Sequence, residues 1–246
     1  MTGCGPTYPC AVSDLARRLA ESPERAAILL DVDGVLAPIV LRPEDARVPN
    51  ETRAEVERLA HRYSVVACVS GRTSAEAERI VAVPDVVYLG SHGLELAPEA
   101  QEWRERMHRF AIAADWPVED KGLTVSFHYR GADDEAAARE RLETIADDAR
   151  AQGLLARFGR KVLELRPPIQ ADKGTAVQAL LTDRGLRRAL YAGDDTTDLD
   201  GFRGLDGLEL AVRVAVSSPE GPPELREAAD LVVDGPAGAL ELLKTL

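Results

Sequence analysis

The sequence predicts an α/β fold built on a parallel sheet with helices on both faces. Short, continuous apolar runs alternate along the chain with longer amphipathic stretches. Strands that are buried on both faces of a parallel sheet have this apolar character. The predicted strands are 26–30, 64–69, 86–89, 190–192 and 231–233, and the predicted helices are 14–20, 74–82 and 173–182. Asp31, Ser70 and Asp194 each come just after a predicted strand, where ligands bind in such sheets.

The middle of the chain breaks this rhythm and predicts an inserted α+β module. It contains a helix at 99–113, an alternating strand at 123–130, a long helix at 133–152 and a hairpin-like pair at 154–158 and 161–165. Alternation indicates a strand with one covered face and one open face, which is typical of antiparallel sheets. We therefore predict a core domain of residues 1–97 and 171–246 and an inserted α+β domain of residues 98–170.

Composition and charge exclude several functional classes. The chain has 42 acidic and 30 basic residues, a net charge of -12, and no block of Lys and Arg, so no nucleic-acid partner is expected. Residues 1–10 lack a basic start followed by an apolar stretch, so no secretory signal is expected. No apolar run reaches the roughly 18 residues of a membrane span. The three cysteines lack metal-site spacing. We expect a cytoplasmic protein without membrane association.

Two carboxylates, Asp31 and Asp33, follow the first predicted strand, and Gly34 comes next. A turn at Gly34 would let both carboxylates face the sheet edge. One can then attack phosphorus while the other delivers a proton to the leaving oxygen. Taken alone, the pattern fits an ordinary polar turn equally well, because Asp and Gly are common in turns.

A second acidic cluster, Asp194, Asp195 and Asp198, follows the predicted strand at 190–192. Carboxylates this close together raise one another's pKa values and destabilise the folded chain unless a cation compensates them. A hard divalent cation with oxygen ligands resolves the conflict. Asp194 is the best candidate for a direct ligand, and Asp195 and Asp198 are candidates for direct or indirect contact with the metal.

Two further positions carry groups that suit a phosphate. Ser70 and Gly71 lie between a predicted strand and a predicted helix, where a hydroxyl and backbone N–H groups can bind an anion. Lys173 opens another predicted helix, although the helix dipole disfavours a cation there. An ordinary helix cap at Ser70 and a solvated Lys173 remain open alternatives at this point.

The order of these motifs resembles that of the haloacid dehalogenase (HAD) phosphatases. The resemblance implies a Rossmann-like HAD core in which Asp31 is the nucleophile and Asp33 is the general acid and base. It also implies that Ser70 and Lys173 bind the transferring phosphoryl group. Mg²⁺ is the implied cofactor, bound by the carboxylates of Asp31 and Asp194 and by the main-chain carbonyl of Asp33.

Further stretches resemble one branch of these enzymes, the trehalose-6-phosphate phosphatases. The matches include Ser70-Gly71-Arg72, Gly90–Glu95, Glu119–Gly122, His128–Arg130 and Val162–Pro167. The resemblance implies hydrolysis of a sugar phosphate, with the inserted domain as a cap over the sugar. The predicted substrate contacts are Gly71, Arg72, His92, Glu119, Lys121, His128, Arg130, Arg160 and Glu164. Without the resemblance, the polar strand faces of the insertion would be expected to face solvent.

Several alternatives stay open at the level of sequence. A phosphatase for sucrose phosphate, mannosyl-phosphoglycerate or a pseudo-disaccharide phosphate would use the same core. A phosphomutase of the same superfamily is another possibility. A non-catalytic phosphosugar-binding regulator is a third, but loss of catalysis would most simply remove Asp31 or Asp33, and both are present. A receiver-type signalling module is disfavoured, because it needs only about 120 residues and no insertion.

Overall fold

The computed structural model describes residues 10–40, 42–159, 161–219 and 221–246. Arg160, one of the predicted sugar contacts, therefore lies outside the described residues. The chain divides into two compact units, one formed by Met1–Gly93 and Ala171–Leu246 and the other by Leu94–Gln170. The domain bounds inferred from the sequence place the first boundary at 98, and that assignment stays a prediction.

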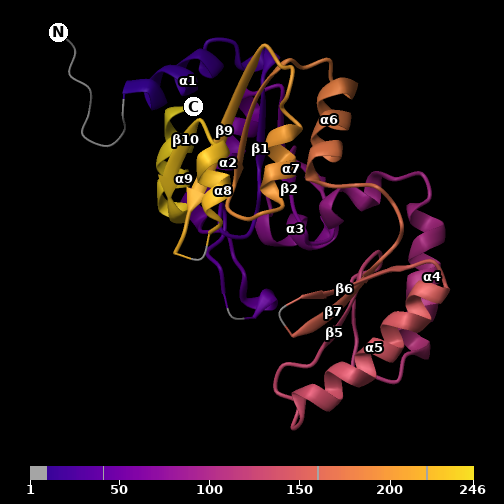
Figure 1. The fold of residues 1–246 in the computed structure, drawn as a ribbon. Helices are drawn as coiled ribbons and strands as arrows, with labels where there is room; N and C mark the ends of the chain where they lie inside the picture. Colours follow the sequence, from indigo (N-terminus) through magenta and orange to yellow (C-terminus); the bar gives the residue numbers. More distant parts are fainter. Residues whose placement is uncertain (1–9, 41, 160, 220) are drawn as a thin grey trace. The chain divides into compact units, whose positions relative to one another are not determined.

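The first unit is built on a six-stranded parallel sheet with the order β10-β9-β8-β1-β2-β3 (Figure 1). This sheet confirms the predicted α/β class. Its strands are β1 (Ala27–Leu30), β2 (Val65–Val69), β3 (Val87–Leu89), β8 (Arg188–Gly193), β9 (Leu210–Ser217) and β10 (Leu231–Asp234). Every residue of β1 and β2 is buried, as their continuous apolar runs predict.

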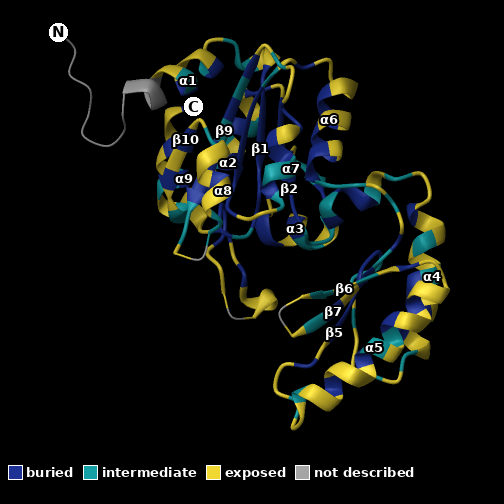
Figure 2. Ribbon diagram, in the orientation of Figure 1, coloured by how far each residue is buried: buried dark blue, intermediate teal, exposed yellow. Residues whose placement is uncertain are grey.

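Helices cover both faces of this sheet, and each face has its own apolar core (Figure 2). Residues of α1 (Cys10–Ala20), α2 (Asn50–Arg62), α3 (Ser74–Val81) and α9 (Gly235–Thr245) pack on one face. Residues of α6 (Lys173–Asp183), α7 (Asp198–Arg203) and α8 (Pro223–Ala228) pack on the other. Short 3₁₀ helices lie at Pro23–Arg25, Pro43–Asp45 and Ser91–Leu96.

The second unit contains a four-stranded antiparallel sheet with the order β4-β5-β7-β6. Its strands are β4 (Glu119–Asp120), β5 (Val125–His128), β6 (Leu155–Gly159) and β7 (Val162–Arg166), and its helices are α4 (Ala100–Ala113) and α5 (Glu135–Ala151). Alternate strand residues such as Phe127 and Leu163 pack with Met107 and Leu142 of the two helices. The predicted α+β character of this segment is therefore present, with one sheet face covered by helices.

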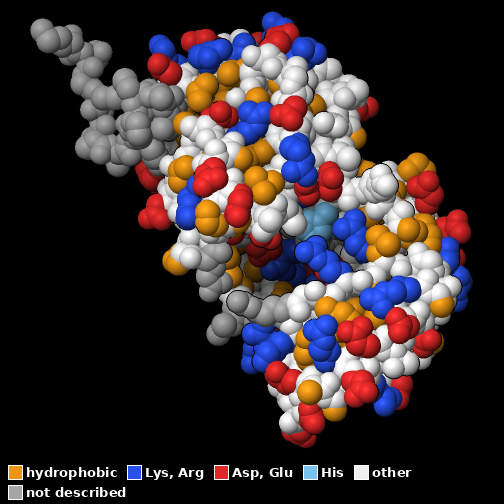
Figure 3. Space-filling view, viewed as in Figure 1, with side chains coloured by type: hydrophobic (Ala, Val, Ile, Leu, Met, Phe, Trp, Pro, Cys, Tyr) orange, Lys and Arg blue, Asp and Glu red, His pale blue; other side chains and the backbone are white. Residues whose placement is uncertain are grey.

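The surface and the helices add two observations. Acidic and basic side chains are interspersed over the face of the molecule seen in Figure 3. Within the described ranges, none of the helices combines the length and the apolar character that a membrane crossing requires.

Candidate active site

Asp31 continues the line of β1 and lies at the carboxyl end of the sheet. Its backbone N–H donates to the carbonyl of Ala192 on the neighbouring strand β8, at 2.9 Å. The carboxylate is almost fully buried, and its Oδ1 accepts the N–H of Val32 at 2.7 Å. Burial raises the pKa of Asp31 well above its usual value, and Lys173 opposes this shift. The sheet therefore presents one buried carboxylate in a fixed orientation.

The residues after Asp31 form a tight turn that places Asp33 beside the same edge. Within the turn, Gly34 N–H donates to the carbonyl of Ala37 at 2.8 Å. Gly34 has a φ of +77°, and a side chain there would overlap the Asp194 carboxylate. The Asp33 carboxylate pairs with Arg72, whose Nε and Nη2 lie 2.6 and 2.8 Å from its two oxygens.

Lys173 opens α6 and joins the two acidic clusters. Asp172 caps the helix by accepting the N–H of Thr175 at 2.8 Å, which fixes where the helix begins. The Lys173 Nζ then lies 2.8 Å from Asp31 Oδ2 and 2.7 Å from Asp198 Oδ1. Burial alone would lower the pKa of Lys173, but the two carboxylates raise it above its ordinary value. Lys173 is thus a buried cation between two buried anions, and its side chain is not solvated.

Asp198 is completely buried, and both of its carboxylate oxygens are occupied by hydrogen-bond donors. Oδ1 accepts from Lys173 and, at 2.7 Å, from the hydroxyl of Tyr191. Oδ2 accepts the backbone N–H groups of Asp194 and Asp195, each at 2.9 Å. This geometry requires glycine at position 193, because a side chain there would overlap Asp198. Asp198 has the contacts of a residue that organises its neighbours.

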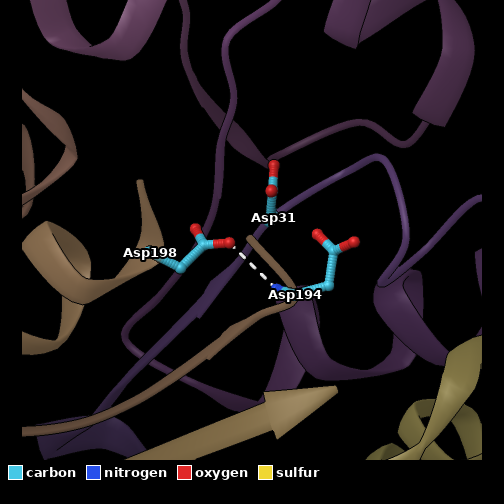
Figure 4. A group of neighbouring side chains, drawn as sticks. All are labelled: Asp31, Asp194 and Asp198. Carbon is cyan, nitrogen blue, oxygen red and sulfur yellow. Dashed lines mark hydrogen bonds between the residues drawn. The ribbon is translucent and has the colours of Figure 1, made fainter. Parts of the chain in front are cut away.

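Asp194 differs from Asp198 although both belong to one cluster. Ligand oxygens of Asp31, Asp194 and Asp198 lie within 4.8 Å of one another, and Figure 4 shows the three side chains as neighbours. Within the described residues, no donor reaches the Asp194 carboxylate. Burial, followed by repulsion from Asp198, raises the pKa of Asp194 to about 7. An oxygen-rich, undercompensated pair formed by Asp31 and Asp194 suits a hard divalent cation.

The other predicted metal residues lie outside this group. Asp195 is exposed, and its carboxylate accepts the N–H of Thr196 within its own turn. The Asp33 carboxylate is engaged by Arg72, although the role predicted for Asp33 at the metal involves its main-chain carbonyl. The three-carboxylate group thus contains Asp31, Asp194 and Asp198, and among these Asp198 is already saturated by donors.

Ser70, Gly71 and Arg72 form the turn between β2 and α3. Ser70 is buried, and its Oγ accepts the N–H of Arg72 at 3.1 Å. Thr73 caps α3 in a reciprocal pair with Glu76. The Arg72 guanidinium binds Asp33 and the carbonyl of Pro43, and its contact with a substrate stays a prediction. The turn therefore connects the predicted phosphate seat directly to Asp33.

His92 lies against this same turn. Its backbone N–H donates to the Ser70 carbonyl at 3.0 Å, and Ser91 N–H donates to the Arg72 carbonyl at 2.7 Å. The imidazole is packed so closely on Gly71 that a side chain at that position would clash with it. Both Ser91 and His92 have positive φ, which is strained for residues with a side chain. His92 is thus brought to the predicted phosphate seat.

Three of the predicted sugar contacts form a cluster in the second unit. Glu119 Oε2 lies 3.0 Å from His128 Nε2 and 3.3 Å from Lys121 Nζ. Burial raises the pKa of Glu119, but the hydrogen bonds from His128 and Lys121 outweigh it and leave that pKa below its usual value. Glu119 is opposite Ser126, and Ser126 is opposite Glu164, so the three occupy one row across the sheet. Arg130 is exposed just beyond β5.

A family comparison decides where the chain belongs. The model of the trehalose-phosphatase family matches residues 29–117 and 113–236, which cover both units and both acidic clusters. The chain belongs to the trehalose-phosphatase family. The predicted resemblance is thereby confirmed.

Individual relatives agree with the trehalose-phosphatase assignment. The chain is 34% identical to a trehalose-phosphate phosphatase of Mycobacterium avium, over 89% of this chain and 61% of that protein. It is 29% identical to a probable trehalose-phosphate phosphatase G of Arabidopsis thaliana, over 86% of this chain and 67% of the relative. The chain thus spans about three fifths of the length of the mycobacterial protein.

Solved structures of trehalose-phosphatase relatives share the fold. A trehalose-6-phosphate phosphatase related protein superimposes with a TM-score of 0.64 at 25% identity, covering 89% of this chain and 95% of the other. The C-terminal domain of the C. albicans trehalose-6-phosphate phosphatase gives a TM-score of 0.69 at 21% identity, covering 94% and 95%. A haloacid dehalogenase-like hydrolase from Bacteroides thetaiotaomicron has a TM-score of 0.60. The Rossmann-like HAD core is therefore confirmed.

The sequence pattern does not single out two residues that lie close to the predicted sites of this trehalose-phosphatase family member. Tyr191 lies in the middle of an apolar strand, where its hydroxyl has no visible partner in the sequence, yet it binds Asp198. Arg157 is directly opposite Glu164 in the strand register and is exposed. Arg157 continues the row that Glu119 and Glu164 occupy, and this neighbourhood depends on a strand register that the residue order does not specify.

Proposed function

We propose that this chain is a Mg²⁺-dependent phosphatase that converts trehalose 6-phosphate to trehalose and phosphate through a phosphorylated Asp31. One observation carries the proposal above the others. The buried Asp31 carboxylate accepts a hydrogen bond from the Lys173 ammonium at 2.8 Å, and an oxygen of the undercompensated Asp194 carboxylate lies within 4.8 Å of it. A nucleophile, a cation for phosphoryl oxygens and a place for a hard metal thus occur together at one sheet edge.

In the first step, the Asp31 carboxylate attacks phosphorus and the bond from phosphorus to the sugar oxygen breaks. Asp33 donates a proton to that departing oxygen, so trehalose leaves as a neutral alcohol. In the second step, a water oxygen attacks the phosphorus of phospho-Asp31 while the ionised Asp33 accepts its proton. The bond between Asp31 and phosphorus then breaks and inorganic phosphate is released.

The remaining core residues hold the phosphoryl group and the metal. Lys173 and Ser70 would bind the transferring phosphoryl oxygens, with backbone N–H groups of the turn at Gly71. The carboxylates of Asp31 and Asp194 and the carbonyl of Asp33 would hold Mg²⁺. The bound ion supplies the positive charge that offsets repulsion between the Asp31 carboxylate and the phosphate.

The second unit would provide the sugar specificity. Glu119 and Glu164 offer carboxylates, Lys121 offers an ammonium and His128 offers an imidazole. Together these groups can accept hydrogen bonds from sugar hydroxyls and donate hydrogen bonds to them. We assign this role to Glu119, Lys121, His128 and Glu164, and on the family resemblance also to Arg130 and Arg160. The substrate is then a phosphorylated disaccharide, and the unit acts as a cap.

The testing experiment measures phosphate release from trehalose 6-phosphate, sucrose 6-phosphate, glucose 6-phosphate and an aryl phosphate, with and without Mg²⁺. The expected result is Mg²⁺-dependent release with a strong preference for trehalose 6-phosphate. Mg²⁺-dependent release from another phosphate would keep the core chemistry and reassign the sugar. The absence of release from every substrate by folded protein would overturn the phosphatase proposal.

A further inference from the structure

Tyr191 lies next to the acidic clusters, and the proposed mechanism gives this residue no role. It lies in β8, and its side chain is fully buried in the core formed with α6, α7 and α8. The ring meets Phe202 edge-on, with centroids 6.0 Å apart and planes at 87°. Its hydroxyl leaves this apolar layer and reaches Asp198 Oδ1 at 2.7 Å.

The same Asp198 oxygen also accepts from Lys173, at 2.7 Å. Lys173 in turn donates to Asp31 at 2.8 Å. A continuous chain of hydrogen bonds therefore runs from the Tyr191 hydroxyl through Asp198 and Lys173 to the proposed nucleophile. Every member of this chain is buried, so its interactions are only weakly screened by water.

We propose that Tyr191 is a positioning residue for phosphoryl transfer, acting through Asp198 to set how Lys173 is shared between Asp198 and Asp31. The inference rests on the proposed function, because the proposed function has Lys173 bind the transferring phosphoryl group. It adds a residue to the site that packs behind the catalytic carboxylates and touches neither substrate nor metal.

The physical reason is a competition for one carboxylate oxygen. Asp198 Oδ1 carries negative charge that attracts the Lys173 ammonium, and the Tyr191 hydroxyl takes up part of that charge. Without the hydroxyl, Lys173 would be drawn more strongly toward Asp198 and away from the phosphoryl oxygens. Burial, together with the carboxylates of Asp198 and Asp31, raises the pKa of Tyr191 well above its usual value, which keeps the hydroxyl protonated as a donor.

Local packing separates the ring from the hydroxyl. A side chain at Gly201 of α7 would overlap the Tyr191 ring, so the helix backbone lies directly against that ring. Phenylalanine would fill the same space and keep this contact. The hydroxyl is therefore not required for packing, and a buried hydroxyl is unfavourable unless it has a partner. Its partner here is the residue that holds Lys173.

The test compares Tyr191→Phe with two control variants. Tyr88→Phe removes another hydroxyl of the same unit. That hydroxyl donates to the Val83 carbonyl at 2.9 Å and makes no hydrogen bond to the acidic clusters. Phe202→Leu disturbs the packing of the Tyr191 ring but leaves its hydroxyl in place. The measurements are kcat and KM for trehalose 6-phosphate and for an aryl phosphate, the binding of orthovanadate with Mg²⁺ by calorimetry, and the thermal unfolding midpoint.

For Tyr191→Phe we expect kcat to fall about tenfold with both substrates, and vanadate to bind about tenfold more weakly, because a hydrogen bond to a charged group is lost. KM should change little, and both controls should stay near the wild type. Equal losses of kcat in Tyr191→Phe and Phe202→Leu would reduce Tyr191 to a packing role and overturn the inference. The inference would also be overturned if Tyr191→Phe kept the kcat and the vanadate affinity of the wild type. If the wild type releases no phosphate, the proposed function fails, and vanadate binding alone still decides the role of Tyr191. A wild type that also binds no vanadate overturns both.

Discussion

Arg72 holds the Asp33 carboxylate in a two-point fork, with Nε 2.6 Å from Oδ2 and Nη2 2.8 Å from Oδ1. Such bidentate pairs fix direction as well as charge, because the planar guanidinium matches the carboxylate. The Arg72 side chain is mostly buried, whereas Asp33 is 38% exposed. The fork therefore orients Asp33, the more exposed residue of the proposed catalytic aspartate pair, through a side chain that is itself more buried.

Replacing Arg72 by Lys keeps the charge and removes the fork. We expect kcat/KM for trehalose 6-phosphate to fall about tenfold, because Asp33 loses its orientation for protonating the sugar oxygen. An aryl phosphate with an acidic leaving group needs no such proton, so its kcat/KM should fall much less. Kinetics with both substrates check this difference. Equal losses on both would show that Arg72 acts on phosphate binding instead.

Replacing Asp31 by Asn removes the proposed nucleophile while keeping its size. Phosphate release should fall below detection, and the folded state should persist, because the Asn side chain still accepts a hydrogen bond from Lys173. Activity and thermal unfolding are measured in parallel. Asp183→Asn is the matched control, since Asp183 is exposed at the end of α6. Substantial turnover by folded Asp31→Asn protein would remove Asp31 from the nucleophile role.

The two clustered aspartates should respond oppositely to amide substitution. All four contacts of Asp198 are accepted hydrogen bonds, so Asp198→Asn turns an amide donor toward other donors. We expect a loss of about 1–3 kcal/mol in the free energy of unfolding. Asp194→Asn instead removes a buried charge that no described donor compensates. It should keep or raise stability without Mg²⁺ at pH 8.

Denaturant unfolding of both variants, with and without Mg²⁺, checks this pair of expectations. The wild type should gain stability from Mg²⁺ by mass action, and Asp194→Asn should lose that gain. A large Mg²⁺ gain retained in Asp194→Asn would contradict its assignment as a ligand. Equal destabilisation of both variants without the metal would contradict the different environments of the two carboxylates.

The sequence was sufficient to predict which residues follow the strand ends. It was not sufficient to predict which of the clustered carboxylates is compensated by hydrogen-bond donors. Continuous apolar runs predicted β1 and β2 because both faces of these strands are buried. The acidic motif that follows β8 predicted a cation requirement. Which carboxylate stays undercompensated depends on the folding of Asp198 back over Gly193, a contact that residue order does not specify.

Strand β9 and helix α2 were not predicted from the sequence, and the physical reason is the same for both. Strand β9 contains Arg213 among its valines, so it lacks the continuous apolar run used to recognise the other core strands. The Arg213 guanidinium reaches Asp206 at 2.7 Å, which explains how a charged residue is accommodated in a central strand. Helix α2 has few apolar residues and buries only Thr52, Val56 and Leu59. In both elements tertiary contacts override a weak local pattern.

Sugar recognition should be separable from phosphoryl transfer. Glu164 is an exposed carboxylate in the second unit and takes no part in the proposed chemistry at Asp31. Glu164→Ala should lower kcat/KM for trehalose 6-phosphate by about tenfold to a hundredfold, the effect of losing a charged hydrogen bond to a sugar hydroxyl. Turnover of an aryl phosphate should be unchanged, because it has no sugar to contact. Glu140→Ala, which removes an exposed carboxylate from α5 in the same unit, should leave both activities unchanged. Kinetics with the two substrates, measured in parallel, check this expectation. Equal losses of kcat/KM on both substrates in Glu164→Ala would show that Glu164 takes no part in sugar recognition and that it lies on an ordinary solvated face of the sheet.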